Sequence, residues 1–114
     1  MDSTSAIEAL SALAQEHRLA LFRLLVQAGQ RGMAAGAIAE ALGIPNSSLS
    51  FHLAQLRGAK LIEQERQHRT IIYRANYPAM NALMAYLMEN CCAASGCESE
   101  AACEGGINEE RESA

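Results

Sequence analysis

The segment from residue 35 to residue 57 constrains the fold more than any other part of this 114-residue chain. Residues 35–42 read as a short helix, and Gly43 can adopt the left-handed backbone that ends a helix in a tight turn. Pro45 and the polar residues after it then give a strong start signal for another helix. The buried side of that helix is expected to consist of Leu49, Leu53 and Leu56. Two short helices joined by a tight glycine turn form a helix-turn-helix.

Two helical patterns precede this unit. Ser3 or Thr4 can cap a first helix, and a second helix is expected to follow a joint at residues 15–17 and to stop near Gly29. The expected apolar sides are Ile7, Leu10, Leu13 and Ala14 in the first helix and Leu19, Phe22, Leu25 and Val26 in the second.

After Lys60 the pattern changes from that of a helix to that of strands. Residues 61–66 and 70–74 flank a polar tip at 67–69, and the β-branched and aromatic residues of the second segment favour a β-hairpin. A final helix is expected to start near Pro78, with an apolar stripe of Met80, Leu83, Met84, Leu87 and Met88. The predicted fold is therefore mostly α (α+β): a winged helix-turn-helix with three helices, a recognition helix, a β-hairpin wing and a C-terminal dimerisation helix.

Positive charge is concentrated between residues 44 and 74. This stretch contains five Arg or Lys residues, two Glu residues and two histidines. Small hydroxyl and amide side chains near the start of the recognition helix suit entry into the DNA major groove, and the basic residues would contact phosphates. The expected DNA-binding residues are Asn46, Ser47, Ser48, Ser50, Phe51, His52, Gln55, Arg57, Lys60, Arg66, His68 and Arg69. For His52, which faces a leucine core, a packing or phosphate-contacting role is favoured over metal ligation.

The chain changes character after Asn90. Residues 91–114 contain all four cysteines and carry six acidic residues against one basic residue, whereas residues 1–90 carry eight basic against seven acidic residues. The net charge of −4 therefore arises in the C-terminal segment and does not exclude a nucleic-acid partner. We expect residues 1–90 to form a DNA-binding and dimerisation domain, and residues 91–114 to form an acidic tail that is flexible beyond its first part.

Two stretches resemble the ArsR/SmtB family of bacterial repressors. Residues 12–25 (ALAQEHRLALFRLL) are similar to the opening of these proteins, and residues 49–56 (LSFHLAQL), with GAKLI at 58–62, resemble their recognition helix and its exit into the wing. The resemblance covers about residues 5–90. It implies a homodimer, joined mainly by its first and last helices, that binds a two-fold operator in double-stranded DNA and leaves it when an inducer binds. The expected dimer-interface residues are Ile7, Leu10, Met80, Leu83, Met84 and Leu87.

Members of this family differ in where the inducer binds, and two familiar sites are missing from this sequence. A Cys-x-Cys before the recognition helix would fall within residues 32–38, which contain no thiol, and a zinc site of Asp and His on the last helix would fall within residues 77–90, which contain neither. The remaining candidate is the thiol cluster. It resembles that of arsenite-responsive members, which carry a Cys-Cys pair and a third cysteine just past the last helix.

The chemistry of trivalent arsenic, As(III), fits such a cluster. As(III) is soft and three-coordinate, so three thiolates satisfy it, whereas tetrahedral zinc prefers four ligands. Adjacent side chains diverge by about 100° on a helix, so Cys91 and Cys92 converge only if the helix unwinds, which Asn90 permits. Gly96 allows a turn that brings Cys97 to the same ion. We expect As(III) as the inducer, with Sb(III) as a second one, no organic cofactor, and Cys103 as an additional candidate ligand.

The sequence therefore predicts an arsenic-responsive transcriptional repressor whose apo dimer dissociates from its operator when As(III) or Sb(III) binds Cys91, Cys92 and Cys97. Two alternatives of the same fold stay open: a thiol redox or persulfide sensor, and a Zn/Cd sensor that also uses Cys103. A thiol enzyme or a metallochaperone is disfavoured, because the sequence has no Gly-rich phosphate loop and no Cys-x-x-Cys at a helix start.

The length and hydropathy of the chain also restrict where it works. No apolar run approaches the roughly 18 residues of a membrane span, and no basic region leads into a hydrophobic stretch at the N-terminus. We expect a cytoplasmic protein with no membrane partner. In a reducing cytosol, clustered cysteines are more often metal-binding or redox-active than structural disulfides. A domain this small often completes its core by dimerising.

Overall fold

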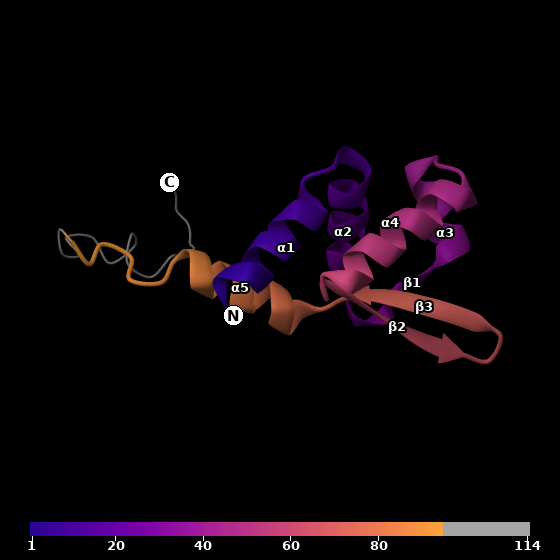
Figure 1. Cartoon of the computed structure of the whole chain (residues 1–114). Coiled ribbons are helices and arrows are strands. Elements are labelled where there is room, and N and C mark those ends of the chain that lie inside the picture. Colours follow the sequence, from indigo (N-terminus) through magenta and orange to yellow (C-terminus); the bar gives the residue numbers. More distant parts are fainter. Residues whose placement is uncertain (95–114) are drawn as a thin grey trace. The chain divides into compact units, whose positions relative to one another are not determined.

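The computed structural model describes residues 1–94, so Cys97 and Cys103 lie outside the described part of the chain. The elements in chain order are α1 (Ser3–Leu13), α2 (Glu16–Ala28), the 3-10 turn η1 (Gly29–Arg31), β1 (Met33–Ala34), α3 (Ala35–Leu42), α4 (Asn46–Gly58), β2 (Ile62–Gln67), β3 (Thr70–Ala75) and α5 (Tyr77–Leu87) (Figure 1). This order confirms the predicted winged helix-turn-helix. The chain divides into two units, Met1–Leu83 and a second that begins at Met84.

Side chains cap the first two helices at their N-termini. The Asp2 carboxylate accepts a hydrogen bond from the main-chain N–H of Ser5 at 2.8 Å, and this bond holds the pKa of Asp2 below its usual value. The prediction that Ser3 or Thr4 caps α1 is wrong, because an ionised carboxylate one position earlier favours the positive end of the helix more strongly than a hydroxyl does. In α2 the Gln15 side chain plays the same role for the N–H of Arg18 at 2.9 Å.

The buried faces of α1 and α2 differ from the predicted ones. Ala6, Ala9 and Ala12 form the buried side of α1, while the larger Ile7 and Leu10 remain 60% and 43% exposed. Because alanine is small, the alanine side of α1 can pack closely against neighbouring helices. The side that carries the larger Ile7 and Leu10 then faces outward. In α2 the buried residues are Leu21, Phe22 and Leu25, whereas Leu19 and Val26, which were predicted to be buried, are exposed.

The helix-turn-helix unit forms as predicted. Gly43 ends α3 in the left-handed conformation at φ 68°, ψ 34°, and its N–H donates to the Ala39 carbonyl at 2.8 Å. Pro45 precedes the first residue of α4, where a missing N–H removes no helical hydrogen bond. The expected core residues Leu49, Leu53 and Leu56 are all buried.

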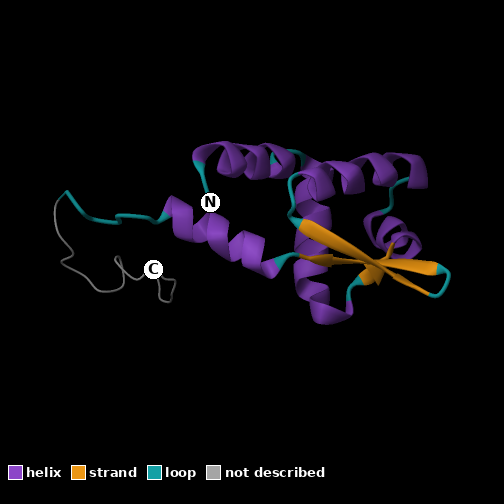
Figure 2. Ribbon diagram, turned by 60° about the horizontal axis from the view of Figure 1, so that its bottom comes forward, coloured by secondary structure: helices purple, strands orange, loops and turns teal. Residues whose placement is uncertain are grey.

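The wing is part of a three-stranded antiparallel sheet with the order β1–β3–β2, whose strands are orange in Figure 2. A two-residue turn at 68–69 joins β2 to β3, and His68 lies at a positive φ of 59° there. The tip is thus one residue shorter than predicted. Strand β1 was not predicted. It has two residues, Met33 and Ala34, which pair with Tyr73 and Ile72.

Several contacts join the wing and α5 to the helical core. The Arg74 guanidinium donates to the Gln30 carbonyl at 3.0 Å and pairs with Glu65 across the hairpin at 2.8 Å. The Asn76 side chain accepts from the N–H of Ala79 and donates to the Lys60 carbonyl, so it caps α5 and holds the exit of α4. Leu61, Ile62, Ala75 and Leu83 complete the core. Among residues 1–94, no helix is long and apolar enough to cross a bilayer.

Candidate DNA interface and thiol pair

The outward side of α4 carries all of the residues on this helix that were predicted to contact DNA, except His52. Because the leucines of this helix face the core, the opposite side is left to solvent. The exposed residues on α4 are Asn46, Ser47, Ser48, Ser50, Phe51, Ala54, Gln55, Arg57 and Gly58. Phe51 is the one large apolar side chain among them, and 56% of its surface is exposed. The start of α4 therefore presents hydroxyls, an amide and a ring to any partner that approaches it.

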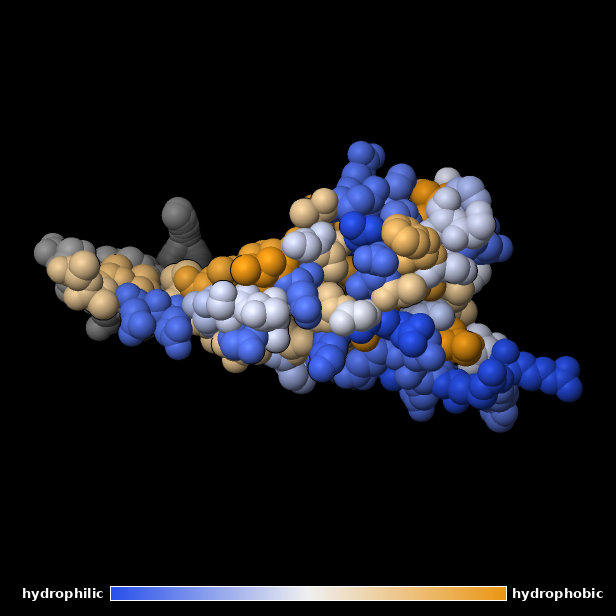
Figure 3. Space-filling model, in the orientation of Figure 1, coloured by the Kyte–Doolittle hydropathy of each residue, from blue (hydrophilic) through white to orange (hydrophobic). Residues whose placement is uncertain are grey.

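Basic residues lie beside this surface on the exit of α4 and on the wing. Lys60, Arg66, His68 and Arg69 are exposed, and Figure 3 shows that the surface over the wing is mostly hydrophilic. Arg74, a basic residue outside the predicted DNA-binding set, is instead held by the Glu65 carboxylate and the Gln30 carbonyl. The hydrogen bond from Arg74 is the main reason that the pKa of Glu65 is lowered. Arg74 thus braces the wing, while the other four side chains remain available to phosphates.

His52 does not belong to the exposed surface. Only 8% of it is exposed, its Nδ1 lies 3.4 Å from a terminal nitrogen of Arg18, and its ring centroid lies 5.6 Å from that of His17. Burial is the main cause that lowers the pKa of His52, and the positive charges of Arg18 and His17 lower it further. This burial favours the packing role that the sequence also indicated over a contact with DNA. The lowered pKa favours a neutral ring at pH 7.

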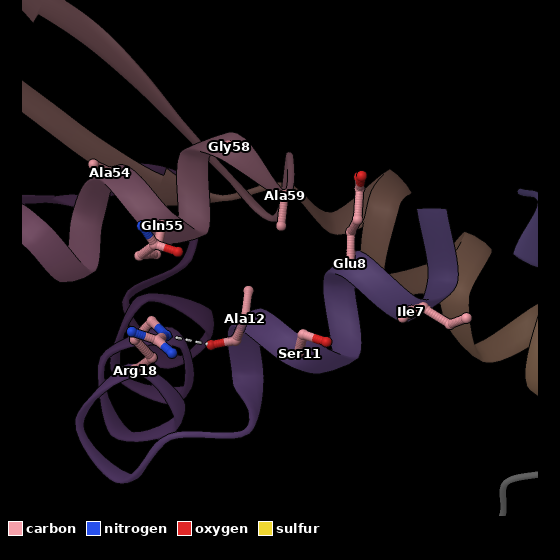
Figure 4. A pocket seen from close by; sticks show the side chains of 9 residues that line it. All are labelled: Ile7, Glu8, Ser11, Ala12, Arg18, Ala54, Gln55, Gly58 and Ala59. Atoms are coloured by element: carbon pink, nitrogen blue, oxygen red, sulfur yellow. Dashed lines mark hydrogen bonds between the residues drawn. The ribbon is translucent and has the colours of Figure 1, made fainter. Parts of the chain in front are cut away.

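Arg18 is a central residue that the sequence patterns did not identify. Its Nε donates to the Ala12 carbonyl at 2.6 Å, near the end of α1, and a terminal nitrogen reaches His52 on α4. One side chain thus connects α1 to the recognition helix. Beside it lies an open hollow of about 510 Å³ between α1 and α4 (Figure 4), lined by Ile7, Glu8, Ser11, Ala12, Arg18, Ala54, Gln55, Gly58 and Ala59.

The predicted break at the end of the last helix is present. Helix α5 ends at Leu87, and residues 88–94 form turns. Asn90 and Cys92 both adopt the left-handed conformation, at φ 61° and 63°. This backbone replaces the regular helical rotation and allows two consecutive side chains to lie on the same side of the chain. The Sγ atoms of Cys91 and Cys92 are 3.4 Å apart, a hydrogen-bond distance for sulfur.

The two thiols are half-buried and influence each other. The hydrogen bond with Cys92 is the main cause that raises the pKa of the Cys91 thiol, and burial and the neighbouring charge add to it. Cys91 is therefore held in its neutral form at pH 7. Cys97 and Cys103 lie outside the described residues, and residues 1–94 contain no group of three His, Cys, Asp or Glu side chains placed to hold a metal.

The residues predicted to form a dimer interface have different exposures. Ile7, Leu10, Met84 and Leu87 are between 43% and 60% exposed, and Met80 is half-buried. Leu83 is only 3% exposed within the single chain, so it packs in the chain's own core and leaves little side-chain surface for a second copy to cover. The interface assignment of the exposed members stays a prediction.

Comparison with known proteins gives consistent results. A family described as a helix-turn-helix domain matches residues 13–65. The chain is 34% identical to the nodulation protein NolR of Rhizobium meliloti, over 77% of this chain and 70% of NolR, and 34% identical to the HTH-type transcriptional regulator YgaV of Escherichia coli K12, over 69% and 80%. The structure is similar to that of an ArsR-like transcriptional regulator from Rhodococcus sp. RHA1, with a TM-score of 0.68 and 26% identity over 79% of this chain and 81% of that one.

Proposed function

This chain belongs to the ArsR family of helix-turn-helix transcriptional regulators, and from that premise we propose that it is a repressor whose inducer is As(III). As a member of the family it is a DNA-binding regulator. In the proposed cycle the apo dimer occupies a two-fold operator, with α4 of each copy in the major groove and the basic wing on the backbone. Capture of As(III) by Cys91, Cys92 and Cys97 then lowers the affinity for DNA.

The contact between Cys91 and Cys92 is the observation that carries this proposal. Thiolates bind a soft metal ion at about 2.3 Å, so two of them at bond angles of about 90–110° have sulfurs roughly 3.3–3.8 Å apart. The observed separation of 3.4 Å falls within this range. Two of the three proposed ligands thus hold a spacing suited to a soft ion, and the shorter separation favours the pyramidal geometry of As(III).

The protonation state of Cys91 affects arsenic binding and thiol oxidation differently. Arsenous acid condenses with three thiols to give a tris-thiolate and three molecules of water, so neutral thiols are suitable reactants and the oxidation state of sulfur does not change. Reaction with peroxide requires the thiolate, and the raised pKa of Cys91 makes that form scarce. At Cys91, therefore, the neutral thiol supports the arsenic function over oxidation by peroxide.

The coupling to DNA is proposed to act through α5. Cys91 and Cys92 lie four and five residues beyond Leu87, the last residue of that helix. Tightening the turn at residues 88–94 around the ion displaces the end of α5, and a displaced dimer helix changes the spacing of the two recognition helices. Typical couplings of about 1–3 kcal/mol correspond to a 5–150-fold loss of DNA affinity. Sb(III), which has the same valence and softness, is expected to act in the same way.

The decisive experiment measures fluorescence anisotropy of an operator duplex selected from a random library with the apo protein. Arsenite, antimonite, zinc, cadmium, peroxide and polysulfide are added in separate titrations. Arsenite is expected to release DNA from the native protein and from the control Cys103→Ser, but not from a variant with serine at residues 91, 92 and 97. Unchanged release from that triple variant contradicts the proposal. Release by peroxide or polysulfide alone identifies a redox or persulfide sensor, and release by zinc or cadmium that is lost in Cys103→Ser identifies a four-thiolate metal sensor.

A further inference from the structure

The residues around α4 are distributed in three zones. With 100° per residue, the buried side, formed by Leu49, His52, Leu53 and Leu56, occupies an arc of about 100°. The centre of the opposite arc holds Ser47, Phe51, Ala54 and Gly58. The amide and basic residues of the helix lie at the flanks of that outward arc: Asn46 and Arg57 on one side, Gln55 on the other. The centre of the outward side therefore consists of one hydroxyl, two apolar side chains and a glycine.

The environment of Phe51 suits a residue that contacts a DNA base. Phe51 is 56% exposed, and its ring meets the ring of His52 edge-on, with centroids 5.7 Å apart and an interplanar angle of 65°. The buried His52 is itself fixed against Arg18, so the base of the Phe51 side chain rests on a rigid support. Both hydrophobic and hydrophilic surface lies over α4 in Figure 3. Exposed Lys60, Arg66 and Arg69 nearby make a negatively charged partner favourable.

The major groove of DNA offers one apolar group for such a ring, the C5-methyl of thymine. Phe and Ala side chains contact this methyl, Ser contacts several bases, and the bidentate readers of guanine and adenine are Arg, Lys, Asn and Gln. None of those four residue types lies at the centre of the outward side of α4. We propose that Phe51, with Ala54 beside it, recognises a thymine in each operator half-site through its C5-methyl group. This inference depends on DNA binding but not on the identity of the inducer.

The test removes the methyl group alone. Each thymine of the selected operator half-site is replaced by deoxyuridine, which keeps base pairing and every other groove atom, and binding of the apo protein is measured by anisotropy at one fixed salt concentration. Burial of a methyl contributes about 0.8 kcal/mol, so we expect one position at which deoxyuridine weakens binding about 4-fold per half-site, or about 15-fold when both half-sites carry it.

Variants of the protein test whether Phe51 causes the loss of affinity seen with deoxyuridine. Phe51→Ser is expected to bind the thymine operator more weakly and to show no further loss with deoxyuridine, while Phe51→Leu retains part of the sensitivity. The control Leu19→Ser removes an apolar side chain of similar exposure from α2 and is expected to keep the full loss. Circular dichroism verifies that each variant is folded.

Three outcomes would overturn the inference. In the first, the native protein binds with unchanged affinity when deoxyuridine replaces any thymine of the half-site. Alternatively, Phe51→Ser would keep the same fold loss as the native protein. Finally, Phe51→Ser would change the dimer to a monomer in size-exclusion chromatography, which would make the ring part of a protein interface. Because all measurements use apo protein, their failure is distinct from a failure of arsenite to release DNA.

Discussion

Replacement of Gly32 by alanine tests how the wing is held to the helical body. Gly32 precedes β1 at φ 68°, ψ −169°, a region that is essentially restricted to glycine. An added Cβ would lie 2.5 Å from the carbonyl oxygen of Tyr73 and 2.7 Å from Cγ2 of Ile72. Both atoms belong to β3, which pairs with β1 at this point. Since the nearest atom is backbone, a side-chain rotation cannot relieve the overlap and β1 must separate from β3.

Gly43 provides a matched control. It also has a φ of 68°, but a Cβ there would meet nothing within 4 Å. Gly43→Ala is therefore expected to lower the free energy of unfolding by about 1–2 kcal/mol, the left-handed penalty alone. Gly32→Ala combines a backbone penalty of about 1–3 kcal/mol with loss of the β1–β3 hydrogen bonds, each about 1 kcal/mol, and is expected to reach about 3–5 kcal/mol. The loss of chain entropy in the unfolded state is the same for both variants and cancels.

Urea unfolding followed by circular dichroism at 222 nm measures the difference. Protein concentration is held constant, because the stability of a dimer depends on it. With a slope of about 1–3 kcal/mol per molar urea, a difference of about 2 kcal/mol places the midpoint of Gly32→Ala about 1 M below that of Gly43→Ala. Equal midpoints, or a lower midpoint for Gly43→Ala, would refute the reasoning that β1 holds the wing in place.

Three further predictions concern single contacts. Asp2→Ala removes the cap of α1 and is expected to lower the free energy of unfolding by about 0.5–2 kcal/mol, whereas Asp2→Asn retains most of it in the same urea experiment. Because the pKa of His52 is lowered in the folded state, protons bind preferentially to the unfolded chain below the unfolded value of about 6.5; stability should therefore fall as pH decreases from 6.5, and less so in His52→Gln. In a Cys97→Ser, Cys103→Ser background, Cys92→Ala is expected to lower the pKa of Cys91 in a titration of thiolate absorbance at 240 nm, and an unchanged pKa would show that the Cys92 contact does not raise it.

The helix-turn-helix could be predicted from sequence because its determinants are local. A glycine in the left-handed conformation and leucines at helical spacing fix α3, the turn and α4 within 24 residues. Strand β1 could not be predicted in this way, because two residues have no periodicity and exist as a strand only through Tyr73 and Ile72. The buried side of α1 was missed for a related reason. Its alanines are buried by close helix packing, which hydropathy alone does not reveal.

The functional residues divide in the same way. The exposed hydroxyls of α4 follow from the phase of its leucines. The environment of His52 includes Arg18, which lies 34 residues away in the sequence. No residue spacing or local composition predicts that these two side chains meet. The cysteine pair and the need for a helix break were predicted from the sequence. Their 3.4 Å separation depends on left-handed backbone at Asn90 and Cys92, and a cysteine at positive φ is uncommon enough that no sequence rule would place it there.

The central claim is that As(III) bound to the C-terminal thiols and DNA bound to α4 oppose each other. Thermodynamic linkage requires the two effects to be equal. The most direct measurement is therefore the affinity of the protein for arsenite in the absence and in the presence of saturating operator. The account predicts that operator weakens arsenite binding by the same factor, about 5–150-fold, by which arsenite weakens operator binding. Equal arsenite affinity in the free and DNA-bound protein would contradict it.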